Sequence, residues 1–163
     1  MQTISGTGAN HLGALFISRF YTFNGPKQVY LSNPTWSMFS PRPCLPRILK
    51  PIPHTVNHFA IWRNVGVEPL TYPSYDPSTV GLDFTGFLSA LQTAPERSVF
   101  LLHACAHNPT GVDPAQDQWR QFADVFLQKG HYAFFDCAYQ GFASGDLDRD
   151  AWTVRSPPSA FQS

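Results

Sequence analysis

Residues 98–136, SVFLLHACAHNPTGVDPAQDQWRQFADVFLQKGHYAFFD, decide the fold class of this chain. The runs 98–103 and 131–136 are almost continuously apolar, as is typical of buried strands. The order strand, helix, strand with apolar strands predicts a parallel α/β sheet that is covered on both faces. The helix between the two strands is indicated by apolar residues at helical spacing: Trp119, Phe122, Ala123 and Phe126.

The same pattern continues on the amino-terminal side of this stretch. Asp83 is the expected N-cap of a helix over 84–91, and Gly66 is the expected stop of a helix that begins at Asn57. Short apolar runs predict strands at 29–31 and 67–72. We expect a further helix over 8–21, with a buried face formed by Leu12, Leu15, Phe16 and Phe20.

The composition is that of a globular protein. Of the 163 residues, 43% are hydrophobic and the formal net charge is zero, so nothing points to nucleic acid or an anionic membrane as a partner. No apolar run approaches the roughly 20 residues of a spanning helix. The three cysteines, Cys44, Cys105 and Cys137, do not form a disulfide framework, which indicates an intracellular, reducing location.

Three glycine- or proline-marked segments are candidates for ligand contacts, each with a simpler alternative. Ser5, Gly6 and Thr7 stand where a helix begins, and free backbone N–H groups make such an end an anion site, although a plain N-cap also explains them. Asn108, in the turn 107–111 after a predicted strand, can donate to a ligand oxygen, but an ordinary turn explains it too. Trp36 offers a flat face to an aromatic ligand, although a single Trp is more often part of a core.

Asp136 ends a predicted strand, and Tyr139 follows three residues later. Ligands of open α/β sheets bind at such strand ends, where a carboxylate can pair with a buried cation; the alternative is a cap of the next turn. His103, Cys105 and His107 are expected to alternate along one strand edge with Cys137 nearby. This spacing is unusual for metal ligands, and neither a metal site nor a Cys–His nucleophile is favoured.

Taken together, these motifs resemble the aspartate aminotransferase family, whose large domain has the fold of type I enzymes that use pyridoxal phosphate (PLP). The resemblance covers nearly all of the chain outside 37–56 and the last eight residues. It runs through these motifs: SGTGA (5–9), SNPTW (32–36), GLDFTGF (81–87), LLHACAHNPTG (101–111), DQW (117–119) and FFDCAYQGFASG (134–145).

The resemblance implies a three-layer αβα large domain with a mainly parallel sheet and PLP as cofactor. Ser5, Gly6 and Thr7 match the phosphate cradle, and Trp36 matches the aromatic residue that stacks on the pyridine ring and touches substrate. Asn108 and Tyr139 match the donors to the phenolic oxygen, and Asn108 also matches the contact to the substrate carboxylate. Asp136 matches the partner of the pyridinium nitrogen, and His58 and His103 match the neighbours of that partner.

Two departures from the family are expected to matter. The proline-rich insert 37–56 and the tail 156–163 lie outside the resemblance, so residues 1–155 are interpreted as an incomplete large domain with an insert; a retained intron and an early stop, or a gene-model error, would produce both. The family's Schiff-base lysine lies beyond residue 145, and Lys27, Lys50 and Lys129 do not match it. The arginines that bind the phosphate and the substrate carboxylates are also unmatched.

The leading hypothesis is therefore a truncated relative of the enzymes that transfer an amino group between L-aspartate and 2-oxoglutarate, inactive alone and holding PLP weakly and without a covalent bond. The alternative is a non-catalytic PLP-binding or assembly module that pairs with an intact aminotransferase. The resemblance implies a homodimer, as in the family. It does not distinguish a cytoplasmic from a mitochondrial location.

Overall fold

The computed structural model describes residues 2–36 and 57–155. The interpretations of 37–56 and 156–163 concern residues outside this part of the chain. A four-stranded parallel sheet in the order β2-β1-β5-β6 organises the fold. Its strands are β1 (Gln28–Asn33), β2 (Glu68–Pro73), β5 (Val99–His103) and β6 (Tyr132–Asp136). The predicted mainly parallel α/β sheet is thus confirmed.

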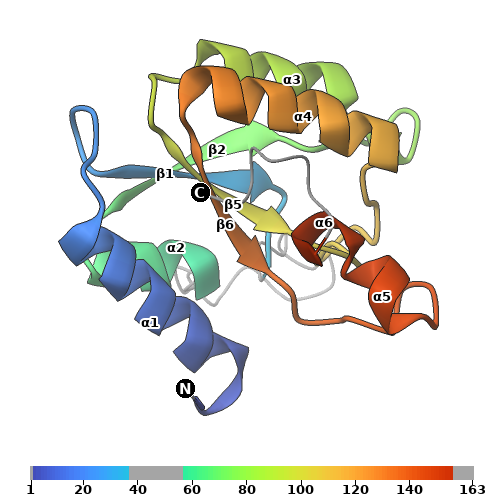
Figure 1. The fold of residues 1–163 in the computed structure, drawn as a ribbon, viewed down its shortest axis with the longest axis horizontal. Coiled ribbons are helices and arrows are strands. Elements are labelled where there is room, and N and C mark those ends of the chain that lie inside the picture. Colours follow the sequence, from blue (N-terminus) through green and yellow to red (C-terminus); the bar gives the residue numbers. More distant parts are fainter. Residues whose placement is uncertain (1, 37–56, 156–163) are drawn as a thin grey trace, which may run out of the picture.

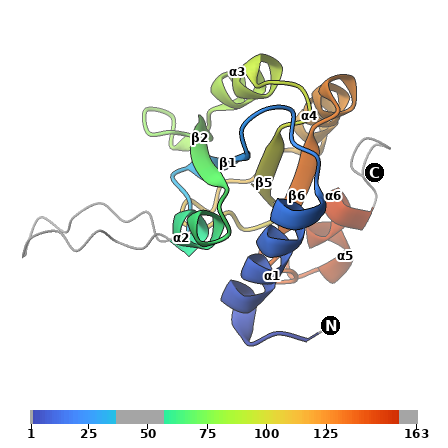
Figure 2. The ribbon, with the colours of Figure 1, turned by 90° about the vertical axis from the view of Figure 1, so that its left-hand side faces the viewer.

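Helices cover both faces of this sheet (Figures 1 and 2). On one face lie α1 (Ser5–Phe20) and α2 (Asn57–Asn64), and on the other lie α3 (Phe84–Thr93) and α4 (Gln116–Lys129). Each pair buries its own apolar cluster against the strands, and the side chains of β5 are buried on both sides. This explains why the sequence of β5 is continuously apolar.

Short elements complete the described part of the chain. A two-stranded antiparallel ribbon, β3 (Tyr75–Asp76) and β4 (Gly81–Leu82), precedes α3, and the short helices α5 (Leu147–Asp150) and α6 (Trp152–Arg155) follow β6. None of these elements was predicted, because two to four residues carry no measurable periodicity. No helix in the described ranges is long and apolar enough to cross a membrane.

The helix boundaries follow from local chemistry. Asp83 caps α3 as predicted, since its carboxylate accepts a hydrogen bond from the backbone N–H of Gly86. Gly66 follows α2 and Gly130 follows α4, both with positive φ angles that glycine adopts without strain. The Gln118 side chain accepts a hydrogen bond from the Ala115 N–H and satisfies one free donor at the start of α4.

The predicted buried face of the first helix was wrong. Phe16 and Phe20 are 61% and 70% exposed, and Leu12 is also exposed. The buried residues of α1 are smaller or polar: Asn10, Ala14, Ile17 and Ser18. Small side chains let α1 approach α2 and the sheet closely, as the 2.7 Å hydrogen bond from the Ser18 hydroxyl to the Val65 carbonyl shows.

The strand 131–136 was also expected to be buried, and this expectation was wrong in degree. All five residues of β6 are half-buried, because β6 ends the sheet order in the described part of the chain. An edge position depends on long-range pairing, which the apolar character of a strand does not reveal.

Candidate active site

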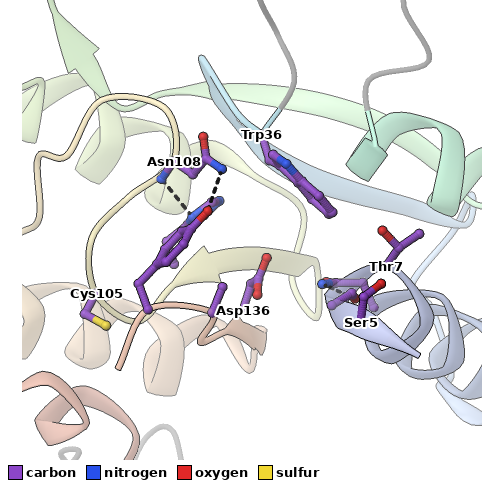
Figure 3. A pocket seen from close by; sticks show the side chains of 11 residues that line it. Ser5, Thr7, Trp36, Cys105, Asn108 and Asp136 are labelled. Atoms are coloured by element: carbon purple, nitrogen blue, oxygen red, sulfur yellow. Dashed lines mark hydrogen bonds between the residues drawn. The ribbon is translucent and has the colours of Figure 1, made fainter. Parts of the chain in front are cut away.

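A pocket of about 210 Å³ opens where β5 and β6 end and α1 begins (Figure 3). The carboxyl ends of parallel strands are the usual ligand position in open α/β sheets. The first turn of α1 faces Asp136 across this pocket, and Asn108 and Trp36 border it (Figure 3). Its lining residues are Ser5, Gly6, Thr7, Asn10, Trp36, His103, Cys105, Asn108, Asp136, Ala138 and Tyr139.

The pocket brings together all seven residues proposed from the sequence to contact a cofactor. Of the two proposed supporting histidines, His103 also lines it, whereas His58 lies fully buried behind Asp136. Sequence reasoning missed Asn10 and Ala138. A polar residue on the buried side of a helix is the one signal that would have found Asn10, and Ala138 carried no signal of its own.

The amino end of α1 supplies backbone donors to one side of the pocket. Ser5, Gly6 and Thr7 form the start of the helix, and the N-cap residue Ile4 makes no side-chain hydrogen bond to it. The N–H groups of this turn therefore keep their hydrogen-bonding capacity, and the helix dipole makes the turn favourable for an anion. A Cβ placed on Gly6 would meet no atom within 4 Å, so the space beside this residue is open.

Asp136 is the charged centre of the pocket floor. It is in register with His103 on β5, and its Oδ2 atom lies 3.1 Å from His58 Nε2. Burial alone would raise the pKa of Asp136, but the hydrogen bond from His58 and the nearby His103 outweigh burial and lower this pKa. Asp136 is therefore an ionised carboxylate at neutral pH.

Thr35 fixes the orientation of His58. The Thr35 hydroxyl lies 2.8 Å from His58 Nδ1, and both residues are fully buried. Because the Asp136 carboxylate only accepts hydrogen bonds, His58 donates its Nε2 hydrogen to it, and in that tautomer Nδ1 accepts a hydrogen bond from the Thr35 hydroxyl. The order Thr35, His58, Asp136 thus forms a directed chain of donors that ends on the carboxylate.

His103 lies beside this series of hydrogen bonds, and its imidazole is held neutral. Burial and the neighbouring His107 and His58 lower its pKa to about 3. Its Nδ1 accepts a hydrogen bond from the Asn108 N–H, so its Nε2 carries the proton, and this buried group has no partner among the described residues. His58, His103 and Asp136 have donor atoms within 4.8 Å of one another. In these tautomers both Nε2 atoms present hydrogens, which does not suit a metal ion.

The predicted alternation of His103, Cys105 and His107 along one strand edge was wrong. β5 ends at His103, and the chain then bends. His107 turns away from the pocket, where its ring nitrogens contact the hydroxyls of Ser32 (2.9 Å) and Thr110 (2.7 Å). His107 therefore belongs to the support of the turn.

Asn108 and Tyr139 meet on the side of the pocket opposite α1. The Asn108 Nδ2 atom donates to the Tyr139 hydroxyl oxygen at 3.3 Å (Figure 3). Asp113 holds the turn that carries Asn108 by accepting hydrogen bonds from the N–H groups of Ala106 and His107. The turn thus has a structural role, and it also places the Asn108 amide in the pocket.

Trp36 closes the upper side of the pocket in Figure 3. Its indole is half-buried and packs edge-on against the His58 ring, with centroids 5.4 Å apart. The indole therefore belongs neither to the apolar core nor to the open surface. Together with the helix end, the carboxylate and the paired Asn108 and Tyr139, it provides partners for an aromatic, anionic ligand.

The chain thus combines a parallel α/β sheet with a ligand pocket at the carboxyl ends of its strands. The family model for aminotransferase class I and II matches residues 46–160. The chain belongs to the class I and II aminotransferase family.

Several relatives are named as aspartate aminotransferases. The cytoplasmic aspartate aminotransferase of Saccharomyces cerevisiae is 48% identical over 95% of this chain, which covers 32% of that relative. The mitochondrial aspartate aminotransferase of Xenopus tropicalis is 47% identical, with 95% of this chain and 31% of the relative covered. The chain thus spans about a third of the length of the curated relatives it matches.

Solved structures agree in fold. The aspartate aminotransferase from the Saccharomyces cerevisiae cytoplasm superposes with a TM-score of 0.76 at 48% identity, over 94% of this chain and 32% of that one. A broad specificity aminotransferase from Leishmania mexicana gives a TM-score of 0.78 at 44% identity, over 94% and 33% of the two chains.

Proposed function

We propose that this chain forms the ring-binding and phosphate-binding part of a PLP site for amino transfer of the aspartate aminotransferase type. The observation that carries the proposal is the series of buried hydrogen bonds from Thr35 through His58 to Asp136, which ends in an ionised carboxylate on the pocket floor. A carboxylate kept ionised in a half-buried site favours a protonated ring nitrogen. PLP, when bound, supplies the electron sink on which amino transfer depends.

The other lining residues have matching roles in this proposal. The N–H groups of Ser5, Gly6 and Thr7 receive the phosphate at the start of α1, where the dipole favours an anion. The Asn108 amide and the Tyr139 hydroxyl, which pair with each other in the pocket, would hold the phenolic oxygen of the ring. Trp36 covers the ring face, and Asn108 also reaches the substrate carboxylate.

The lysines of this 163-residue polypeptide bear on its activity. Lys27 precedes β1 and donates to the Ser18 carbonyl at 2.7 Å, and Lys129 ends α4 just before β6. Both therefore lie at the amino ends of strands, whereas the pocket lies at the carboxyl ends; Lys50 is outside the described residues. We propose that this polypeptide binds PLP without a covalent bond and does not turn over L-aspartate and 2-oxoglutarate alone.

Turnover and covalent attachment test this proposal together. The purified chain is incubated with PLP, treated with borohydride and mapped by mass spectrometry, while glutamate formation from aspartate and 2-oxoglutarate is followed in parallel. We expect no turnover and only the sparse, unselective labelling of lysines that free PLP gives with accessible amines. A PLP adduct on Lys50 accompanied by turnover would contradict the proposal of non-covalent binding.

Exposed apolar side chains favour a second candidate function, that of an assembly module. Phe16 and Phe20 of α1 lie on the surface with ring centroids 4.9 Å apart. Large exposed apolar residues in contact with each other are typical of a surface that another protein covers. Co-purification of the chain with a full-length aspartate aminotransferase would support this role, and a strictly monomeric chain in the same mixture would count against it.

A further inference from the structure

Cys105 and Cys137 lie side by side, each just beyond the end of a neighbouring strand. β5 and β6 are parallel with His103 level with Asp136, and the Ala104 N–H donates to the Asp136 carbonyl at 3.0 Å. Neighbouring strands are about 4.8 Å apart, and disulfides join Cα atoms roughly 4.4–6.8 Å apart. Continued by one residue, this register places Ala104 level with Cys137, and Cys105 is the next residue, so the backbones at the two cysteines lie within reach of one bond.

The two thiols also interact directly, and they differ in exposure. Both thiols are free, and they lie close enough for each to affect the pKa of the other. Cys137 is exposed, whereas Cys105 is 5% exposed and lines the pocket on the side away from Ser5 and Thr7 (Figure 3). Burial raises the pKa of both thiols, that of Cys105 to about 12, so it is their exposure that sets the order in which they react. An oxidant from solution therefore meets Cys137 first, and Cys105 is placed to react second.

We propose that Cys105 and Cys137 form a reversible disulfide in response to a small disulfide such as oxidised glutathione. The Cys137 sulfur attacks one glutathione sulfur, and the other glutathione leaves with the Cys137 proton. The Cys105 sulfur then attacks the Cys137 sulfur of the mixed disulfide, and the second glutathione leaves with the Cys105 proton. Two protein thiols are oxidised and one glutathione disulfide is reduced to two thiols.

The bond has a structural consequence for the pocket. Cys105 lies three residues before Asn108, and Cys137 lies two residues before Tyr139. A disulfide between them ties together the segments that carry this hydrogen-bonded pair, next to Asp136. The cysteine pair is thus a site at which thiol oxidation reaches the ligand pocket without using any residue assigned to the cofactor.

Peptide mapping without reduction tests the proposal directly. The folded C44S variant, which keeps only the two neighbouring cysteines, is treated with oxidised glutathione, alkylated and digested. We expect a cross-linked peptide containing Cys105 and Cys137 that has lost two hydrogen atoms and disappears on reduction. The C105S variant in the C44S background should instead keep glutathione on Cys137, because the second thiol is missing.

Two outcomes would overturn the proposal. One is a folded C44S chain in which Cys137 stops at the glutathione adduct while Cys105 remains free for alkylation after unfolding. The other is a cross-link in the wild-type chain that joins Cys44 to either cysteine in preference to the Cys105–Cys137 bond. The urea-unfolded chain serves as the control, and there we expect no preference for the Cys105–Cys137 pair.

Discussion

At the scale of single residues, Asp136 owes its charge to its neighbours. Burial opposes ionisation, yet His58 and His103 lower its pKa, and the hydroxyl of Thr35 holds the His58 ring in place through a hydrogen bond at Nδ1. The sequence identified Asp136, His58 and His103 because a strand end and a family motif mark them. It did not identify Thr35, whose contribution depends on a contact across 23 positions of the chain.

Replacing Thr35 by Val tests this chain of hydrogen bonds. Val keeps the shape of the side chain but leaves His58 Nδ1 buried without a donor, so we expect the free energy of unfolding to fall by about 1–3 kcal/mol. Chemical denaturation measures the change, and T35S, which retains the hydroxyl, is the matched control. Equal stabilities of T35V and T35S would show that the hydroxyl does not matter.

The buried histidines predict how stability depends on pH. Burial lowers the pKa of His107 from 6.5 to about 4, so the unfolded chain binds more protons than the folded chain between these values. Stability is therefore expected to fall as the pH drops from 6.5 towards 4, above the range in which Asp136 and Asp150 titrate.

Denaturant midpoints measured across this range, for the wild type and for H107Q, check the prediction. The substitution removes one titrating group, so we expect a shallower pH dependence whatever its effect on stability at neutral pH. An unchanged slope in H107Q would mean that His107 does not contribute.

At the scale of elements, apolar runs and the helical spacing of apolar residues located every helix and strand longer than four residues in the part of the chain that the structure describes. The spacing predicted the wrong buried face for α1, because close packing against the sheet requires small side chains there and leaves the large ones on the surface. Gly13 of α1 illustrates this: a Cβ built there would lie 2.4 Å from the Phe134 ring. Phe134 itself packs edge-on against Trp62, so the ring has little freedom to move.

We therefore predict that G13A is destabilising even though alanine favours helices. Crowding at Phe134 should cost about 1–3 kcal/mol of unfolding free energy, more than the helix propensity of alanine returns. G6A in the same helix meets no atom within 4 Å and should be neutral or slightly stabilising. Thermal or chemical unfolding of the two variants compares them, and a G13A as stable as G6A would contradict the packing of α1 on β6.

At the scale of the whole molecule, the described chain has a four-stranded sheet with helices on both faces, and two of its surfaces are left at least partly uncovered. These are the half-buried edge strand β6 and the surface of α1 that carries Phe16 and Phe20. The sequence predicted the layers, since apolar strands alternate with helices. It did not predict the exposed surfaces, because they depend on which elements pack together.

We expect Phe16 and Phe20 to promote self-association. The F16E/F20E variant replaces exposed apolar rings with charge at positions that make no core contacts, so it should shift the chain towards the monomer with its unfolding free energy nearly unchanged. Light scattering after size-exclusion chromatography, in reducing buffer, measures the mass. An identical mass distribution for the two proteins would place any association elsewhere.

The affinity for PLP, measured by equilibrium dialysis at neutral pH, tests most directly whether this pocket is a cofactor site centred on Asp136. We predict saturable binding by the wild type and about 10–100-fold weaker binding by D136N, because a charge-assisted hydrogen bond contributes about 1.5–3 kcal/mol. D148N, at an exposed position on α5 away from the pocket, should bind like the wild type. Equal affinities of the wild type and a folded D136N, or no saturable binding by the wild type, would contradict the assignment.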